Sequence, residues 1–539
     1  MMRNLKKVFV VLLAVLLMTT VISVPVTAAN SESKESYTFS EQVEHKFYQF
    51  VDKLIFMIGK VLNLLIPGKD WAGKIPSIKK YVSEHFYPGK AKFDTEPKEG
   101  AAWSMGFGKE SFLTNIDPYD GSYYLAGSLE PFDGRVPAGV LDDQGVNTVA
   151  ISDGDVTMTY SAIDGFGITR GDVMEIRSRL EKFAEENGII SVNVSALHQH
   201  SCIDTLGLGA PIVPAVLVNP FATVFKEDAM IRGRNPVFME ELYKAVVNSV
   251  TEAVESMSAG SLYYGKADVS DYITDKRDPQ AFDGNIERLR FVPDDGGNEI
   301  WVCEAGIHPV SVSSSSRLLS SDFPHYVEEY VKNETGADLV YIQGAELAIT
   351  RNTDPMHIDP DADDKGRLEA MGAAYGSRLT GIEEETELQP LLNVTHREIT
   401  VKAENPIHIL AGREGLLGSV LARDGLDYCV ITELGYVELG GKLGIVLVPG
   451  EIDPAILWGG AVSASASWKN ESWDYTPWAE TCGADTLICF GLCNDQIGYI
   501  LCDNDVRSML TENEEVNAVS TKSGSILTEA FEQLISEIK

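Results

Sequence analysis

The sequence predicts an α/β fold in which mixed sheets are covered by helices. Helix and strand patterns alternate from about residue 101 to the C-terminus, and four short apolar runs bounded by turn-forming residues are typical of buried strands. These runs lie at residues 300–307, 338–342, 443–448 and 486–492. With 44% hydrophobic and 23% charged residues among 539, the composition is that of a globular protein.

The first 100 residues differ from this pattern. Residues 1–28 have a basic start, an apolar stretch and small residues at Val26-Thr27-Ala28, which predicts a secretory signal peptide and a secreted or cell-surface protein. Residues 29–100 form a lead and connector, in which the apolar stretch 47–66 carries Lys53 and Lys60. We expect an amphipathic helix there, either packed on the main body or lying on a membrane surface. The main domain then covers residues 101–539.

Two helices of this domain can be placed from their periodicity. Residues 172–187 put Ile176, Leu180 and Ala184 on one face, and Gly188 is positioned to end that helix. A strand at residues 189–197 follows directly. Residues 239–257 repeat the helical period, and about the last 15 residues predict a closing helix.

Charge and cysteine content narrow the function classes. Lys and Arg number 44 against 80 Asp and Glu, a net charge of −36 that repels phosphate backbones and argues against a nucleic-acid partner. The seven cysteines contain no CxxC pair, so we expect core thiols, with one disulfide among Cys482, Cys489, Cys493 and Cys502 as the alternative. The HExxH, GxSxG and dinucleotide-binding motifs are absent from the sequence.

Polar residues that follow the predicted strands are the candidates for chemistry. Residues 190, 192, 194 and 196 form one apolar face of a strand, and the two-residue period places His198 and His200 on that same face. Two imidazoles that leave a buried face are typical of a metal site, and satisfied core histidines are the alternative. His308 follows the run 300–307, and Glu451 follows 443–448. Asn494, Asp495 and Tyr499 follow 486–492 in the same way.

The positions of these residues indicate one site. Ligand sites of α/β proteins gather at the carboxyl ends of strands, where two His, a Glu and an Asn or Tyr would here come together. Zinc binds histidine nitrogens and carboxylate oxygens and leaves a coordination position for water. The sequence therefore predicts metal-assisted hydrolysis at the carboxyl ends of the strands.

Five segments, in this order, resemble motifs of the neutral, non-lysosomal ceramidase family, as in a divergent bacterial-type member. They are residues 194–201 (Val-Ser-Ala-Leu-His-Gln-His-Ser), 277–282 (Arg-Asp-Pro-Gln-Ala-Phe), 306–309 (Gly-Ile-His-Pro) with 320–326 (Ser-Ser-Asp-Phe-Pro-His-Tyr), 448–451 (Val-Pro-Gly-Glu) and 494–499 (Asn-Asp-Gln-Ile-Gly-Tyr). The family consists of zinc amidases that cleave the N-acyl bond of ceramide. The resemblance implies that residues 101–539 form a ceramidase-like catalytic domain.

The resemblance also implies roles for individual residues. One zinc ion per chain would be held by His198, His308, Glu451 and Tyr499, and the choice between His198 and His200 as the ligand stays open. His200 would then transfer a proton to the leaving amine. Arg277 would lie beside the substrate and, with Tyr499, offset charge on the oxyanion.

Two departures from the family pattern bear on activity. The family's Gln-Ser-Asn-x-Gly-Asp segment, whose Ser has been assigned to catalysis, corresponds here to Gln343-Gly-Ala-Glu-Leu-Ala348, so that Gly344 replaces the Ser. A serine nucleophile is excluded at this position. Only 40 residues follow Tyr499, too few for the family's C-terminal immunoglobulin-like domain, which we expect to be absent.

The sequence thus predicts a secreted zinc-dependent hydrolase of an amide bond, with an N-acyl lipid as the candidate substrate. The alternatives are a catalytically degenerate metal-containing binding protein and a hydrolase of an ester or peptide-like substrate. The acidic stretch 359–366 is expected to be a solvated loop, with a weak Ca²⁺ site as the alternative, because the glycine and glutamate of an EF-hand are missing. The oligomeric state is left open.

Overall fold

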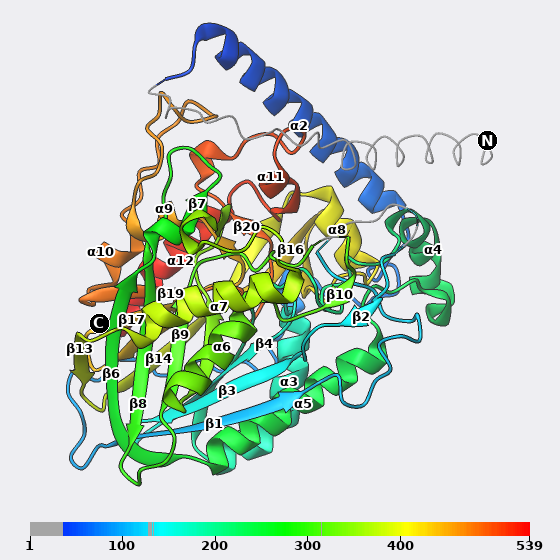
Figure 1. The fold of residues 1–539 in the computed structure, drawn as a ribbon. Helices are drawn as coiled ribbons and strands as arrows, with labels where there is room; N and C mark the ends of the chain where they lie inside the picture. Colours follow the sequence, from blue (N-terminus) through cyan, green and yellow to red (C-terminus); the bar gives the residue numbers. More distant parts are fainter. Residues whose placement is uncertain (1–35, 128–131, 133, 314) are drawn as a thin grey trace, which may run out of the picture.

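The computed structural model describes residues 36–127, 132, 134–313 and 315–539, so the predicted signal peptide lies outside the described residues. Within these ranges the chain is a mixed α/β protein with two large sheets flanked by helices, as the sequence predicts (Figure 1). None of the helices in the described part combines the length and the apolar character needed to cross a bilayer.

The larger sheet has nine strands. Its order is β11 (Asp338–Gln343), β9 (Ile300–Ala305), β8 (Asn285–Pro293), β6 (Ser258–Asp268), β1 (Trp103–Ser111), β3 (Gly145–Ser152), β4 (Thr157–Ile163) and β5 (Ile189–Ala196), and β13 (Glu385–Leu388) also pairs with β6. The β4–β5 and β9–β11 pairs are parallel, and the other pairs are antiparallel. The sheet curls back on itself, so that β11 approaches β3, and the Asn147 amide on β3 donates to the Leu339 carbonyl on β11 at 3.3 Å.

Two pairs of helices cover this sheet. Helices α3 (Arg170–Glu186) and α5 (Pro236–Glu255) pack on the half that contains β3, β4 and β5, whereas α6 (Asp322–Thr335) and α7 (Asp364–Thr380) pack on the half that contains β9 and β11. The predicted helices at 172–187 and 239–257 are therefore confirmed. Gly188 follows α3 with φ +65°, a left-handed conformation that suits glycine after a helix end.

The second sheet has five strands in the order β14 (Leu392–Ala403), β16 (Asp427–Leu439), β17 (Leu443–Leu447) and β19 (Thr486–Phe490), with β15 (Leu421–Asp424) paired to β16. One face packs against the larger sheet, where the Phe490 ring lies edge-on to Tyr160 with centroids 4.9 Å apart. The other face is covered by α10 (Trp478–Cys482) and by α12 (Ser523–Ile538), where Trp478 stacks on Phe531. The predicted closing helix is thus confirmed.

Hydrogen bonds join the ends of strands in the larger sheet to the segment that follows β19 in the second sheet. The Val194 N–H donates to Asn494 Oδ1 at 3.0 Å, and the Asn494 N–H donates to the Val194 carbonyl at 2.8 Å. At the end of β11, the Gln343 carbonyl accepts from the Gly491 N–H at 2.8 Å. These bonds bring the carboxyl ends of β5, β11 and β19 to one place, which is where the sequence predicts the site.

Apart from α2 (Phe39–Leu65) and α4 (Ile212–Phe225), which are described below, the remaining elements are short. They are β2 (Gly139–Val140) paired with β10 (Leu318–Leu319), β7 (Ile273–Asp275) paired with β12 (Ile349–Arg351), β18 (Glu451–Ile452) paired with β20 (Tyr499–Ile500), α9 (Pro454–Trp458), α11 (Asn513–Asn517), and the 3-10 turns η1 (Ile78–Lys80), η2 (Glu227–Ala229), η3 (Ser270–Tyr272), η4 (Asp354–Met356) and η5 (Asp503–Asp505). After Tyr499 the chain forms η5, α11 and α12 rather than an immunoglobulin-like sandwich.

The helix expected at residues 47–66 is α2 (Phe39–Leu65), which begins earlier than its apolar run. Thr38 and Glu41 form a capping box, in which the Thr38 N–H donates to Glu41 Oε2 at 2.8 Å and fixes the start of the helix. At its other end, α2 packs on α8 (Pro406–Arg413), where the Asn63 amide donates to the Pro406 carbonyl at 3.2 Å. One face of α2 is therefore packed on the main body.

The structure also describes the seven cysteines and the acidic stretch 359–366. All seven cysteines are buried free thiols, as the core interpretation predicts, and none forms a disulfide. In the acidic stretch 359–366, Asp359 Oδ1 accepts from the Asp361 N–H, and Asp363 Oδ1 accepts from the Gly366 N–H at the start of α7. These carboxylates serve as local acceptors, and the choice between a solvated loop and a weak Ca²⁺ site stays a prediction.

Candidate active site

The histidines His198 and His308 each direct their Nε2 atom at the carboxylate of Glu451. His198 lies just beyond β5 and donates from Nδ1 to the Phe166 carbonyl at 2.7 Å. His308 lies just beyond β9 and donates from Nδ1 to the Ile349 carbonyl at 2.8 Å. With both Nδ1 atoms occupied, the Nε2 atoms face Glu451 Oε2, at 3.6 Å from His198 and 3.1 Å from His308. Fixing one ring nitrogen with a carbonyl is how proteins orient a metal-ligating histidine.

Glu451 and Tyr499 are neighbours through strand pairing. They are directly opposite in the parallel β18–β20 pair, which places their side chains on the same side of that pair. The Gln496 amide donates to Glu451 Oε1 at 3.2 Å. The four ligands that the family resemblance implies, His198, His308, Glu451 and Tyr499, are thus brought together by the fold.

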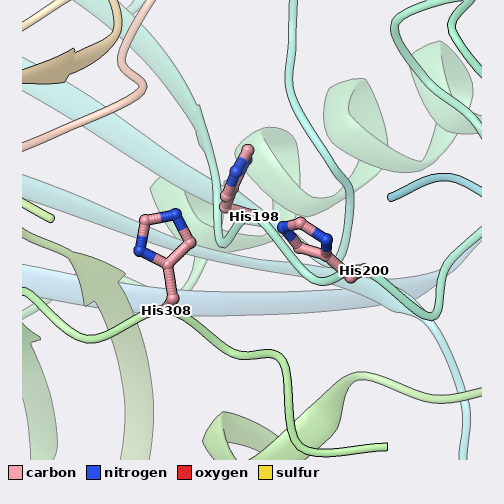
Figure 2. Close-up of side chains that lie close together, drawn as sticks. All are labelled: His198, His200 and His308. Atoms are coloured by element: carbon pink, nitrogen blue, oxygen red, sulfur yellow. The ribbon is translucent and has the colours of Figure 1, made fainter. Parts of the chain in front are cut away.

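His200 lies beside this group. Its ring is edge-on to His198 with centroids 5.0 Å apart, and the centroid of His308 lies 6.2 Å away (Figure 2). Its Nε2 is buried and has no hydrogen-bond partner among the described residues. The His198 Nε2 lies 3.6 Å from Glu451 Oε2. Ligand nitrogens of His198, His200 and His308 also lie within 4.8 Å of one another, so the choice between His198 and His200 as the ligand stays a prediction.

Glu346 belongs to the same cluster, and the sequence analysis did not single it out. Its side chain is fully buried, its Oε2 lies 3.5 Å from His308 Nδ1, and it accepts a hydrogen bond from the Gln343 amide. With His198, His308 and Glu451 it forms a group whose ligand atoms all lie within 4.8 Å of one another. The signal that could have found it is its position after β11, another strand that ends at the site.

The charges of the site are set by burial and by these contacts. Burial alone would lower the pKa of His308, but Glu346 and Glu451 raise it to about 9. Burial would raise the pKa of Glu451, yet His198 and His308 hold it below its ordinary value. Burial raises the pKa of Glu346 to about 8, although His308 opposes the shift. Burial, together with the neighbouring His198 and His308, lowers the pKa of His200, which keeps that imidazole neutral.

The donor set fits a divalent cation. Two imidazole nitrogens and a carboxylate oxygen, with a tyrosine oxygen beside them, match the ligands that zinc accepts. Several buried polar atoms without partners gather here: His200 Nε2, Glu346 Oε1, Gln343 Oε1 and Gln496 Oε1. Buried polar groups are normally satisfied, so this concentration of unsatisfied donors and acceptors is expected of a site that holds an ion and water.

The backbone of the site is strained at several non-glycine residues. His198, Ala348, Leu492 and Asn494 all have φ between +50° and +64°. For side chains other than Asn this left-handed conformation is costly, at about 1–3 kcal/mol each, and such strain is concentrated at functional sites. At His198 it turns the ring from the strand direction toward Glu451.

Arg277 is not part of the histidine cluster. Its guanidinium donates to the Asp505 carbonyl at 3.0 Å and to Glu515 Oε1 at 3.3 Å. It also lines a small cavity together with Leu347, which follows Glu346 in the sequence, and Asp453, which lies two residues after Glu451. Its role beside the substrate stays a prediction, since its donors are directed at carboxylates of its own chain.

Gly344 is required by the position of Glu304. A Cβ atom at residue 344 would overlap Glu304 Oε1 and approach the Gly306 nitrogen at 2.9 Å. The Glu304 carboxyl therefore occupies the space that a serine side chain would need. Burial raises the pKa of Glu304 well above its ordinary value, so this carboxyl is neutral.

We expect Gly344→Ser to lower stability by about 1–3 kcal/mol, as overpacking of a filled interior does. Thermal unfolding of the variant measures this loss. Glu304→Ala provides the matched background, because it empties the space, and there the added serine is expected to cost much less. An equal loss in both backgrounds would contradict the account.

Fold and site together define an α/β protein with a histidine–carboxylate centre at the junction of two mixed sheets. Among solved structures, the chain is similar to neutral ceramidase from Pseudomonas aeruginosa, with a TM-score of 0.60, 14% sequence identity, and coverage of 81% of this chain and 74% of the other. It is equally similar to a ceramidase complexed with C2, with a TM-score of 0.59, 14% identity and coverage of 81% and 75%. The neutral ceramidase fold is thus confirmed.

Comparison by sequence gives no further relative. No protein-family model matches the chain, and no curated protein matches it. The likeness is therefore one of fold at low sequence identity.

Proposed function

We propose that the protein is a zinc-dependent hydrolase of the amide bond of an N-acyl lipid, similar in reaction to a ceramidase. The observation that carries the proposal is the convergence of the His198 and His308 Nε2 atoms on Glu451, next to Tyr499. The fold shared with neutral ceramidase supports the same class of reaction. The charge and position of these residues are what a cation and an amide carbonyl require.

His198, His308, Glu451 and Tyr499 would hold the ion. A bound zinc ion lowers the pKa of a ligand water and polarises the carbonyl. Burial, and after it Glu451, raises the pKa of Tyr499 well above its ordinary value, so its hydroxyl keeps its proton and donates to oxygen. His200 is neutral, and its free Nε2 can accept a proton and pass it to the leaving amine.

His200→Asn is expected to lower kcat by about a hundredfold to ten-thousandfold, the usual contribution of a general acid–base group, and to leave metal content unchanged. The matched control is His325→Asn, because His325 lies on α6 in an ion pair with Glu329, outside the histidine cluster. Steady-state kinetics and metal analysis of both variants make the test. Loss of the metal in His200→Asn would instead identify His200 as a ligand.

The substrate class is tested by matched acyl compounds. The purified protein, supplied with zinc, is incubated with an N-acyl sphingoid base and with an ester of the same fatty acid, and the released acid is measured by mass spectrometry. We expect release from the amide by the wild type and none by His308→Ala. Release from the ester alone would replace the amide proposal.

A catalytically degenerate binding protein is the second candidate, and Gly344 is the observation that favours it. The family's serine is missing, and Glu304 takes its space. Wild-type protein that binds the metal but releases no acid from any of these compounds would establish that alternative.

Export of the protein is part of the main proposal and rests on the sequence of residues 1–28.

A further inference from the structure

The outer face of α2 carries a continuous apolar stripe. Eight large hydrophobic side chains recur every three or four residues over the 27-residue helix and are between 40% and 83% exposed: Phe39, Val43, Phe47, Phe50, Leu54, Met57, Val61 and Leu65. Scattered exposed apolar residues are ordinary, but a stripe along an entire helix marks an interaction surface. At about 1.5 Å per residue, this stripe is about 40 Å long.

Helix α4 (Ile212–Phe225) extends this surface. Its inner face packs with α2 in one cluster, in which Val216 joins Leu62 and Ile66. Its outer side chains Leu217, Val218, Phe221 and Phe225 are 39–74% exposed. Figure 1 shows α4 beside the C-terminal end of α2. The twelve exposed side chains of the two helices are called the α2–α4 surface below.

Basic residues line one edge of the α2 stripe. Lys46, Lys53 and Lys60 repeat every seven residues and therefore lie in a row on the same side of the helix. Lys60 pairs with Asp427, whereas Lys46 and Lys53 have no carboxylate within 4.0 Å in the part of the chain that is described. Helix α2 also carries Glu41, Glu44 and Asp52, so its charges sum to zero, whereas the whole chain has a net charge of −36.

The lysine row helps to decide whether the α2–α4 surface binds a second copy of the chain or a phospholipid bilayer. If a second copy of α2 packed on the stripe, the lysines would face either lysines or the opposite row of Glu44, Val51 and Ile58, which offers one carboxylate to three lysines. A phospholipid interface offers phosphate groups at the level of the lysines and acyl chains below the stripe. The charge pattern therefore fits a bilayer.

We propose that the α2–α4 surface binds the interface of a phospholipid bilayer, with α2 lying in the membrane plane. The inner side of α2 lines a cavity of about 600 Å³ with His45 and Tyr48, and this cavity shares Pro279 and Ala461 with the smaller cavity that reaches Leu347. Membrane-bound α2 would thus lie over these two adjoining cavities. Binding itself does not depend on the proposed hydrolysis, so the two proposals fail separately.

The test is flotation of the purified protein with vesicles of phosphatidylcholine that contain a minor share of phosphatidylglycerol. We expect the wild type to float with the vesicles. The double variant Phe50→Gln/Met57→Gln removes two exposed side chains from the centre of the stripe and is expected to weaken binding by at least about tenfold. Lys46→Gln/Lys53→Gln is expected to weaken it by about fivefold for each lysine.

Leu426→Gln is the matched control, because Leu426 is 62% exposed and lies outside the α2–α4 surface. It is expected to bind as the wild type does. Wild-type protein that stays with the unbound fraction, or an equal loss of binding in Leu426→Gln, would overturn the proposal. Light scattering completes the test, since a dimer that dissociates in Phe50→Gln/Met57→Gln would identify a second copy as the occupant.

Discussion

Glu451→Gln is expected to lower metal affinity by more than about a hundredfold, beyond the usual effect of losing a supporting residue. The reason is that Oε2 of this carboxylate is the atom on which the Nε2 atoms of His198 and His308 converge. Glutamine keeps the size of the side chain and removes its charge. Competition titration against a zinc-binding dye measures the change.

Glu346→Gln gives the graded comparison. Glu346 lies on the Nδ1 side of His308, away from the Nε2 atom that faces Glu451, so it supports the ring rather than the ion. Its replacement is expected to cost about tenfold to a hundredfold in affinity. Wild-type affinity in Glu451→Gln, or a larger loss in Glu346→Gln than in Glu451→Gln, would contradict the assignment of ligands.

Glu433→Gln is expected to lower the free energy of unfolding by about 3–5 kcal/mol, as the breaking of a buried ion pair does. Arg177 donates to both Glu433 oxygens, at 2.7 and 2.9 Å, and Arg170 donates to the same carboxylate. All three side chains are buried, so the variant leaves two guanidinium groups without full charge compensation. Urea unfolding measures the loss.

Glu240→Gln is the matched control for this prediction. Glu240 accepts from Arg179 at 2.8 and 3.1 Å in a similar two-bonded pair, but both side chains are partly exposed. Water screens such a pair, and its removal is expected to cost less than about 1 kcal/mol. Similar losses in the two variants would show that burial does not decide the effect.

The buried contacts of Glu433 with Arg177 and Arg170 also predict how stability depends on pH. Burial would raise the pKa of Glu433, but Arg177 and Arg170 outweigh it and hold the pKa of Glu433 well below the ordinary value of 4.5. A carboxylate whose pKa is lower in the folded state stabilises the fold above its ordinary pKa, and this stability is lost as the pH falls below that value. Acid unfolding is therefore expected to depend less on pH in Glu433→Gln than in the wild type.

The sequence could predict the strands that deliver the site, because their local patterns end where the polar side chains begin. His198, His308 and Glu451 were all found in this way. Glu346 was missed, since its segment was interpreted only through the replacement of a serine by Gly344. Recognising its role required the position of His308 Nδ1, a contact between two separate strands.

Other features depend on contacts between distant parts of the chain. The start of α2 is the exception: it lies before the apolar run because Thr38 and Glu41 cap it, and this local motif can be recognised in the sequence. The ion pairs of Arg277 with Asp505 and Glu515 join residues more than 200 positions apart and leave no local pattern. The curl that brings β3 to β11 likewise follows from packing between non-neighbouring strands.

Metal content tests the central claim most directly. Plasma mass spectrometry of the purified wild type, beside His198→Ala, His200→Ala and His308→Ala, compares the predicted ligands with the predicted proton carrier. We expect about one zinc ion per chain in the wild type and in His200→Ala, and none in the other two variants with their circular dichroism unchanged. A wild type that holds no divalent metal after reconstitution, or a His308→Ala variant that keeps it, would rule out the proposed zinc site.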